Sequence, residues 1–210
     1  AAVDHFRIRV HGRSTHVSTP HLGVDALYIA SQIVVAVQGL VTRRTSPTEP
    51  VIIGIGKLNA GTTYNAVAAF AEMEGTTRTI SQESRDRVRA QVSETAQSIA
   101  ALYGGTAEIE WTDFAAALVN DPQVCEEAAQ VVDELLGEGH VVTDRELSLS
   151  GDNFAEFELY KPGAYAYLGT GNPDLPHTMI TNHNGGFDVD ENALVTGAGL
   201  YVGYTVARLG

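Results

Sequence analysis

Residues 4–115 carry strand and helix patterns in a fixed order. The segment "DHFRIRVHG" places Phe6, Ile8 and Val10 at every second position between polar residues, which predicts a half-buried strand. Helix patterns follow over residues 23–44 and 81–105, and strand patterns over 51–61, 66–79 and 107–114. The order β-α-β-β-α-β predicts a ferredoxin-like α+β domain over residues 4–115.

The remaining residues, 116–210, show a different pattern of predicted elements. Asp121 and Pro122 open a helix pattern, because Asp is a good N-cap and Pro suits the first helical position. The expected elements are a helix over 121–137, a short strand near Val141 and Val142, a short helix over 152–160, a buried strand over 163–169, a long loop over 170–191 and a helix over 192–209. Two predicted strands are too few to bury the apolar faces of these helices well. The expected fold class is α/β, with the α+β domain in front.

Composition excludes some classes of partner. The net charge is −13 and the isoelectric point is near 4.8, which argues against nucleic acid or an anionic membrane as a partner. No run of 18 apolar residues occurs, so no membrane span is expected. Cys125 is the only cysteine, which excludes an intrachain disulfide and favours the cytoplasm. The chain enters a strand pattern within its first residues, so we expect it to begin inside a longer protein.

Three of the seven histidines lie on one loop, "HGRSTHVSTPHLGVD". His11, His16 and His21 are five residues apart, a spacing that imposes no common direction on a loop. A metal site built from this loop alone would need a carboxylate, and only Asp25 is near. These histidines are therefore either ordinary loop residues or hydrogen-bond donors to a neighbouring site, and spacing alone leaves both readings open.

A second group of titratable residues lies in "LPHTMITNHNGGFDVDE". His183 follows a predicted buried strand, and loops after such strands bind ligands in open α/β sheets. We therefore regard His183 as a candidate metal ligand. Asp190 and Glu191 are expected to cap the last helix. The chain has no HExxH, paired CxxC, Walker or GxSxG motif, so this group alone does not indicate a hydrolytic centre.

Asn65 and Arg78 lie in "NAGTTYNAVAAFAEMEGTTRT". Their simplest interpretation is a hairpin whose Asn tolerates the left-handed turn conformation and whose Arg is a surface charge. Asp152 and Asn153, in "LSGDNFAEF", precede an apolar pair and are expected to cap a short helix.

Four segments together resemble the co-catalytic zinc peptidases, a family that includes aminoacylases, hippurate hydrolases, auxin-conjugate hydrolases and carboxypeptidase G. "FRIRVHGRSTHVSTPHLGVDAL" is similar to the family's strand followed by G-x-x-x-H-x-x-x-P-H-x-x-x-D. "GKLNAGTTYNAVAAFAEMEGTTRT" resembles its G-x-x-x-A-G-x-x-x-N-V-x-P … G-T-x-R-T segment. "LSGDNFAEF" stands where the family has S-E-D-F, and "NHNGGFDVDENAL" resembles its closing H-x-P-x-F-x-x-D-E-x-A-L. The nearest branch is that of the N-acyl-amino-acid amidohydrolases.

The resemblance implies an architecture and an activity. In this family a ferredoxin-like lid, which also dimerises the protein, interrupts a catalytic α/β domain. Residues 4–115 would be the lid and 116–210 the C-terminal segment of the catalytic domain, with the N-terminal half absent. The activity would be metal-dependent hydrolysis of the amide bond of N-acyl amino acids or small peptides, by a homodimer with two divalent ions per site, zinc or manganese. The 210-residue chain by itself would be inactive.

The resemblance also implies roles for individual residues. His16 matches a lid His that donates to the tetrahedral oxyanion in the partner subunit's site, and Asn65 matches a lid Asn with a similar role. Arg78 matches an Arg that pairs with the substrate carboxylate, and His183 matches the C-terminal metal ligand.

The sequence departs from the family pattern in three places. Asp152-Asn153 replaces a Glu-Asp pair, "HNGG" lacks the Pro after the His, and "NAVA" replaces N-V-x-P. These departures leave two alternatives: a non-catalytic dimerising or small-ligand-binding module, and an inactive paralogue.

Overall fold

The computed structural model describes all residues from 1 to 210, and they form two compact units. Unit 1 comprises Ala1–Leu118 and Ser148–Glu156. Unit 2 comprises Val119–Leu147 and Phe157–Gly210. All of the strands lie in unit 1.

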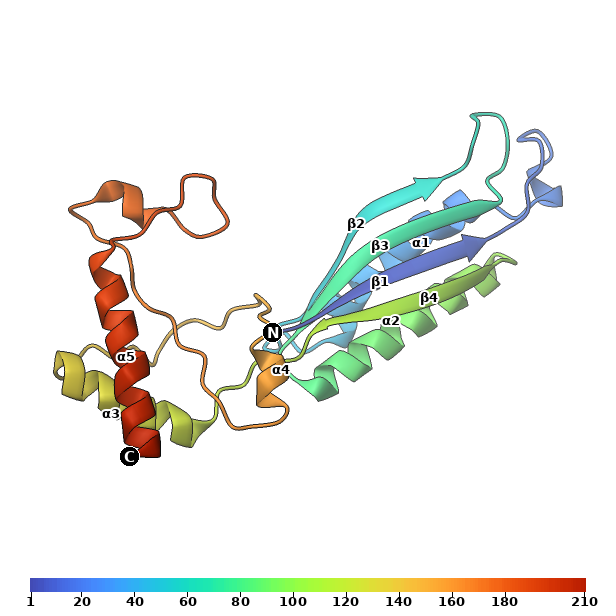
Figure 1. Ribbon diagram of the computed structural model, residues 1–210. Coiled ribbons are helices and arrows are strands. Elements are labelled where there is room, and N and C mark those ends of the chain that lie inside the picture. Colours follow the sequence, from blue (N-terminus) through green and yellow to red (C-terminus); the bar gives the residue numbers. More distant parts are fainter. The chain divides into compact units, whose positions relative to one another are not determined.

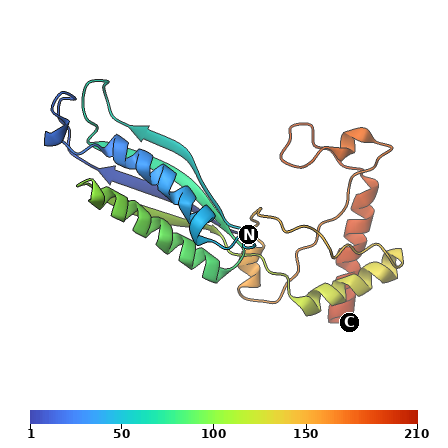
Figure 2. The same cartoon turned by 180° about the vertical axis from the view of Figure 1, so that it is seen from behind.

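Unit 1 is a four-stranded antiparallel sheet with two helices on one face (Figures 1 and 2). Its elements are β1 (Ala2–His11), α1 (Ala26–Gly39), β2 (Ile52–Ala60), β3 (Phe70–Thr79), α2 (Gln82–Leu102) and β4 (Thr106–Ala115). The strands lie in the order β2-β3-β1-β4. This arrangement confirms the ferredoxin-like prediction.

The helix-covered face of the sheet forms the core. Phe6, Ile8 and Val10 are fully buried, as the alternation in β1 predicts. They pack against buried residues of β3 and of both helices, among them Met73, Ile29, Ile33, Val37, Val88 and Val92. Gly75 pairs with Phe6, and a Cβ atom there would lie 2.3 Å from Phe6 Cζ. Because glycine has no Cβ atom, position 75 leaves room for the Phe6 ring over β3.

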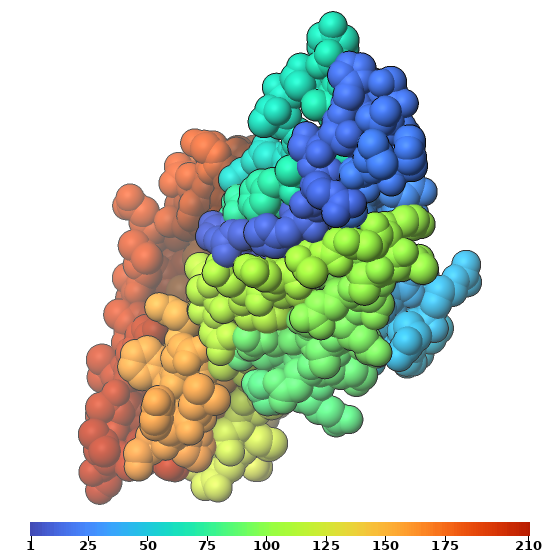
Figure 3. All heavy atoms as spheres, turned by 90° about the vertical axis from the view of Figure 1, so that its right-hand side faces the viewer, coloured from blue at the N-terminus to red at the C-terminus, as the bar shows by residue number.

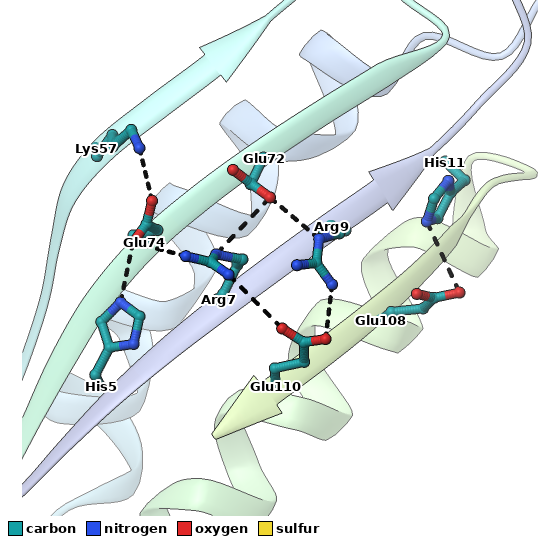
Figure 4. Close-up of polar contacts among 9 residues, drawn as sticks. All are labelled: His5, Arg7, Arg9, His11, Lys57, Glu72, Glu74, Glu108 and Glu110. Atoms are coloured by element: carbon teal, nitrogen blue, oxygen red, sulfur yellow. Dashed lines mark hydrogen bonds and ion pairs between the residues drawn. The ribbon is translucent and has the colours of Figure 1, made fainter. Parts of the chain in front are cut away.

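The opposite face of the sheet carries charged side chains, which we call the charged face (Figure 4). Its members are His5, Arg7, Arg9, His11, Lys57, Glu72, Glu74, Glu108 and Glu110. Arg9 bridges two strands, because its guanidinium lies 3.1 Å from Glu72 on β3 and 2.8 Å from Glu110 on β4. Hydrogen bonds from Lys57 and His5 lower the pKa of Glu74 to about 2. Cross-strand pairs of this kind favour the antiparallel register and suit an open, hydrated face.

Helix α1 has a capped start and a widened last turn. The Asp25 carboxylate accepts hydrogen bonds from the N–H groups of Leu27 and Tyr28, at 3.0 and 3.2 Å, as an N-cap. A π turn, η2 (Leu40–Arg44), continues the helix. The segment Ala26–Arg44 is long and apolar enough to span a membrane by length and composition alone. Five residues of α1 are nevertheless buried in unit 1. The apolar character of α1 is therefore that of a core helix.

A buried ion pair joins β1 to α2. Arg85 Nη2 lies 2.6 Å from Asp4 Oδ1, and Arg85 Nε donates to both carboxylate oxygens at 3.1 Å. The two side chains are only 7% and 1% exposed. Thr77 Oγ1 also donates to Asp4, at 3.4 Å, so the carboxylate is partnered on several sides. The charges are thus buried with their hydrogen bonds made, as burial of charge requires.

Unit 2 contains two long helices, α3 (Pro122–Leu136) and α5 (Asn192–Leu209), with the short 3-10 helix η3 (Pro176–Met179). Asp121 caps α3 as expected, accepting from the N–H groups of Gln123 and Val124 at 3.0 Å. The expected helix over 152–160 is the short α4 (Ala155–Glu158), at the boundary between the units.

The strands expected near residues 141–142 and over 163–169 are not formed, so these two predictions were wrong. A strand needs a neighbouring strand to accept and donate its backbone hydrogen bonds. Neither segment has such a neighbour in unit 2. An apolar run shows that a segment can be buried in a sheet, but it does not show whether the partner strand is present.

We expect Arg85→Ala to lower the free energy of unfolding by roughly 3–5 kcal/mol, because it leaves the Asp4 carboxylate buried without its partner. Arg87→Ala is the control, since Arg87 pairs with Glu49 at a more exposed position, where such pairs contribute about 0–1 kcal/mol. Urea unfolding of the two variants would measure both. Equal losses of stability would contradict the importance of the buried pair.

Candidate functional site

Two loops lie together at one end of the unit 1 sheet, and we call them the paired loops. They are residues 12–25, after β1, and residues 61–69, between β2 and β3. Figure 3 views this end, with the first loop in blue and the second in teal. Backbone hydrogen bonds join them: Val17 N to Asn65 O at 3.1 Å and Val67 N to Thr15 O at 2.9 Å, with a β-bridge between His16 and Ala66. The bridge places the backbone segments that carry His16 and Asn65, two of the candidate residues, beside each other.

His16 is exposed, and its ring has a local partner. Its Nδ1 atom lies 2.7 Å from the Ser18 hydroxyl oxygen and accepts a hydrogen bond from the Ser18 backbone N–H at 3.2 Å. Its Nε2 atom has no partner in the protein. His21, on the same loop, makes no side-chain hydrogen bond. His11 is the last residue of β1 and lies 3.8 Å from Glu108 on the charged face.

Asn65 is half-buried, and one side of its amide is occupied. Thr63 Oγ1 donates to Asn65 Oδ1 at 3.2 Å, which leaves the amide NH₂ without a partner in the protein. The left-handed turn conformation considered for Asn65 is not adopted, because His183 is the one non-glycine residue with positive φ.

A hollow of about 230 Å³ lies beside this loop, between Ala60 and the start of α1. Its lining includes the Asp25 carboxylate, which already serves as the helix cap. The hollow therefore adds no free acid or base to the paired loops.

Arg78 lies at the other end of the sheet. The register places Phe70 opposite His11 and Arg78 opposite Val3. Eight positions along a strand correspond to about 26 Å at roughly 3.3 Å per residue. The Arg78 guanidinium makes no ion pair. The pKa of the Ala1 amino group is lowered, mainly by burial and secondly by the positive charge of Arg78. Within one chain, therefore, the paired loops and Arg78 do not meet.

His183 lies in unit 2 on an exposed turn, with φ of 61°. Its neighbour Asn184 holds the turn by accepting hydrogen bonds from the N–H groups of Gly186 and Phe187, at 2.9 and 3.0 Å. No group of three or more His, Cys, Asp or Glu side chains in the chain is placed to hold a metal ion. His183 is therefore not part of such a group.

Other polar residues of this region have structural roles. Asp190 accepts from the Asn192 N–H at 3.0 Å and so caps α5, whereas Glu191 makes no capping bond, so only half of that expectation is correct. Asp152 accepts from the Phe154 N–H at 2.8 Å, which is the capping role expected for it. Asn153 is exposed.

Ser18 and Thr63 were missed by the sequence reasoning. Each hydroxyl lies two residues from a candidate donor, and Ser and Thr commonly bond to groups a few residues away. That spacing is the signal in the sequence that identifies them.

Comparison with known proteins gives consistent relatives. Residues 3–103 match the family model of the M20 peptidase dimerisation domain. The chain is 33% identical to thermostable carboxypeptidase 1 of Saccharolobus solfataricus over 199 residues, which are 94% of this chain and 49% of that protein. It is 32% identical to the N-acetyl-L-cysteine deacetylase of Bacillus subtilis over 195 residues, covering 93% of this chain and 45% of that one.

A solved structure agrees with these relatives. The YXEP protein of Bacillus subtilis, described as a dinuclear metal-binding peptidase of the M20 family, superposes with a TM-score of 0.79 and 28% identity. The match covers 100% of this chain and 50% of that one. The chain thus spans about half the length of the curated relatives it matches, and it belongs to the M20 family of peptidases and amidohydrolases, whose dimerisation domain it carries.

Proposed function

We propose that this chain is part of a metal-dependent hydrolase that cleaves the amide bond of N-acyl amino acids or small peptides. The observation that carries the proposal is the backbone bridge between the paired loops, which brings together the segments of His16 and Asn65, each with a side-chain N–H donor that has no partner in the protein. Donors aimed at an oxygen on which negative charge develops stabilise the transition state of acyl transfer. Relatives that are a carboxypeptidase and a deacetylase support the same reaction class.

Arg78 would bind the carboxylate of the substrate. A guanidinium without an ion pair is available for a two-point contact with a carboxylate, which selects free acids. Arg78 lies about 26 Å along the strand from the paired loops at about 3.3 Å per residue, too far to share a small substrate with them. The proposed site therefore combines the paired loops of one copy with Arg78 of another.

His183 would supply one ligand to a pair of divalent ions, zinc or manganese. The other ligands and the general base would come from residues beyond these 210, in keeping with the greater length of the relatives. Bound metal ions of this kind polarise the amide carbonyl and lower the pKa of a bound water. Under the proposal, residues 4–115 serve as lid and dimerisation domain, and 116–210 as the C-terminal segment of a cytoplasmic enzyme's catalytic domain.

The homodimer would form along α1 and the edge strand β2. Gln38 donates to Ile53 O at 3.2 Å, so this face of α1 borders β2. Leu27 and Leu58, on the same seam, are 50% and 42% exposed. Strand β2 carries a single charge, Lys57, whereas the other edge, β4, carries Glu108, Glu110 and Asp113. Charges protect an edge from pairing with another chain, so β2 is the edge left open for association.

We expect His16→Ala, in the protein that contains this chain, to lower kcat by about 10²–10³-fold, because one transition-state donor is removed. The bound metal content should not change, which elemental analysis would measure. His21→Ala is the control on the same loop. Loss of metal in His16→Ala would show that His16 is a ligand instead, and absence of hydrolysis by the unmodified protein would favour a non-catalytic module.

We expect the 210-residue chain to bind zinc only weakly in isothermal titration calorimetry, because tight zinc sites use three or four protein ligands and His183 is one. His183→Ala should reduce even this weak binding, with His140→Ala as a control at another exposed histidine. Tight stoichiometric binding of zinc to this chain would contradict the proposal that most ligands lie elsewhere.

We expect Leu58→Lys to shift the chain from dimer toward monomer in light scattering, because it puts a charge on the proposed seam. Thr112→Lys introduces the same side chain on the other edge strand and should leave the dimer intact. A monomeric unmodified chain, or dissociation by Thr112→Lys alone, would rule out this interface.

A further inference from the structure

The Ser18 backbone N–H constrains which ring nitrogen of His16 carries the proton. A backbone N–H can only donate, and it lies 3.2 Å from His16 Nδ1. Nδ1 must therefore accept, and in a neutral imidazole the proton is then on Nε2. The Ser18 hydroxyl, 2.7 Å from the same nitrogen, donates to it as well. With two donors directed at Nδ1, the exposed Nε2–H of His16 becomes the donor that faces solvent.

Thr63 acts on Asn65 in the same way. Its hydroxyl donates to Asn65 Oδ1 at 3.2 Å, which occupies the acceptor side of the amide. The NH₂ group, which can only donate, is the part left free. Both candidate residues thus have their acceptor atoms occupied by a hydroxyl two residues away.

We propose that Ser18 and Thr63 are positioning residues that hold His16 and Asn65 as hydrogen-bond donors. This assignment deepens the proposed function, because it rests on His16 and Asn65 facing a developing oxyanion. An oxyanion needs donors only, and a ring or an amide that turned its acceptor toward it would repel it. Ordering the donors before the substrate arrives also avoids their reorganisation during the reaction.

The tautomer of His16 is measurable in the 210-residue chain itself. Long-range ¹H–¹⁵N correlation spectra, with the His16 signals assigned through His16→Ala, should show Nε2 protonated and Nδ1 unprotonated at a pH where the ring is neutral. His21, which has no side-chain partner, supplies the reference for a free ring. Ser18→Ala removes the hydroxyl but keeps the backbone N–H, so the His16 shifts should move part of the way toward those of His21, whereas Ser18→Thr should keep the original pattern. A proton on Nδ1 in the unmodified chain would overturn the assignment for Ser18.

The amide of Asn65 offers a parallel readout. In ¹⁵N relaxation measurements, the side-chain NH₂ of Asn65 should be ordered in the unmodified chain and become mobile in Thr63→Val. Thr62→Val, which removes a neighbouring hydroxyl without a side-chain partner, should leave it unchanged. An amide that is equally mobile in all three proteins would remove Thr63 from the proposal.

Kinetics of the protein that contains this chain connect the positions to the reaction. Ser18→Ala and Thr63→Val should each lower kcat by roughly tenfold with little change in KM, because a displaced donor is missed mainly in the transition state. Ser14→Ala and Thr62→Val should keep the original kcat. An increase in KM with an unchanged kcat would contradict a positioning role.

The two proposals fail in different ways. If the unmodified protein hydrolyses no N-acyl amino acid or peptide, the proposed function is wrong, and the tautomer and relaxation measurements still decide whether Ser18 and Thr63 hold the donors. If hydrolysis occurs and Ser18→Ala changes neither the His16 tautomer nor kcat, the function stands and the positioning role of Ser18 is wrong.

Discussion

Strand β1 carries both faces of unit 1, because its alternate residues point to opposite sides of the sheet. Phe6 and Ile8 lie in the core, while Arg7 and Arg9 lie on the charged face between carboxylates of β3 and β4. A shift of register by one residue would bury the arginines and expose the core residues. The core residues on one face and the ion pairs on the other both fix the register of β1. This register also determines where β1 ends and the first of the paired loops begins.

That end point decides which residues can act together. The first of the paired loops follows β1 and the second precedes β3, so the segments of His16 and Asn65 lie side by side although the two residues are 49 positions apart. Arg78 lies at the far end of β3, eight positions along the strand from Phe70. A site that uses all three residues needs two copies of the chain. Under the proposed function, dimerisation would be part of assembling the site, and an edge strand with as little charge as β2 suits that requirement.

The sequence was sufficient for unit 1 because each element there finds its partners within the chain. The apolar alternation in β1 and the helical spacing over 81–105 describe surfaces that do pack on one another. Unit 2 differs, since the run over 163–169 has the composition of a buried strand but no neighbouring strand. In the candidate site, His16 and Asn65 were identifiable through the resemblance of their segments to a known family. The roles of Ser18 and Thr63 depend on side-chain directions in loops, which periodic patterns do not report.

Helix α5 extends this reasoning to unit 2. It has 18 residues, many of them apolar, yet none of them is buried; Val195, Tyr201 and Leu209 are 78%, 82% and 81% exposed. Apolar surface of this extent is unusual on a soluble domain unless another element covers it. The relatives are about twice as long as this chain; under the proposed function, residues beyond these 210 would cover α5 and supply a strand beside residues 163–169. The same proposal places further ligands beside His183, so it would explain the missing sheet partner, the uncovered helix and the isolated candidate ligand together.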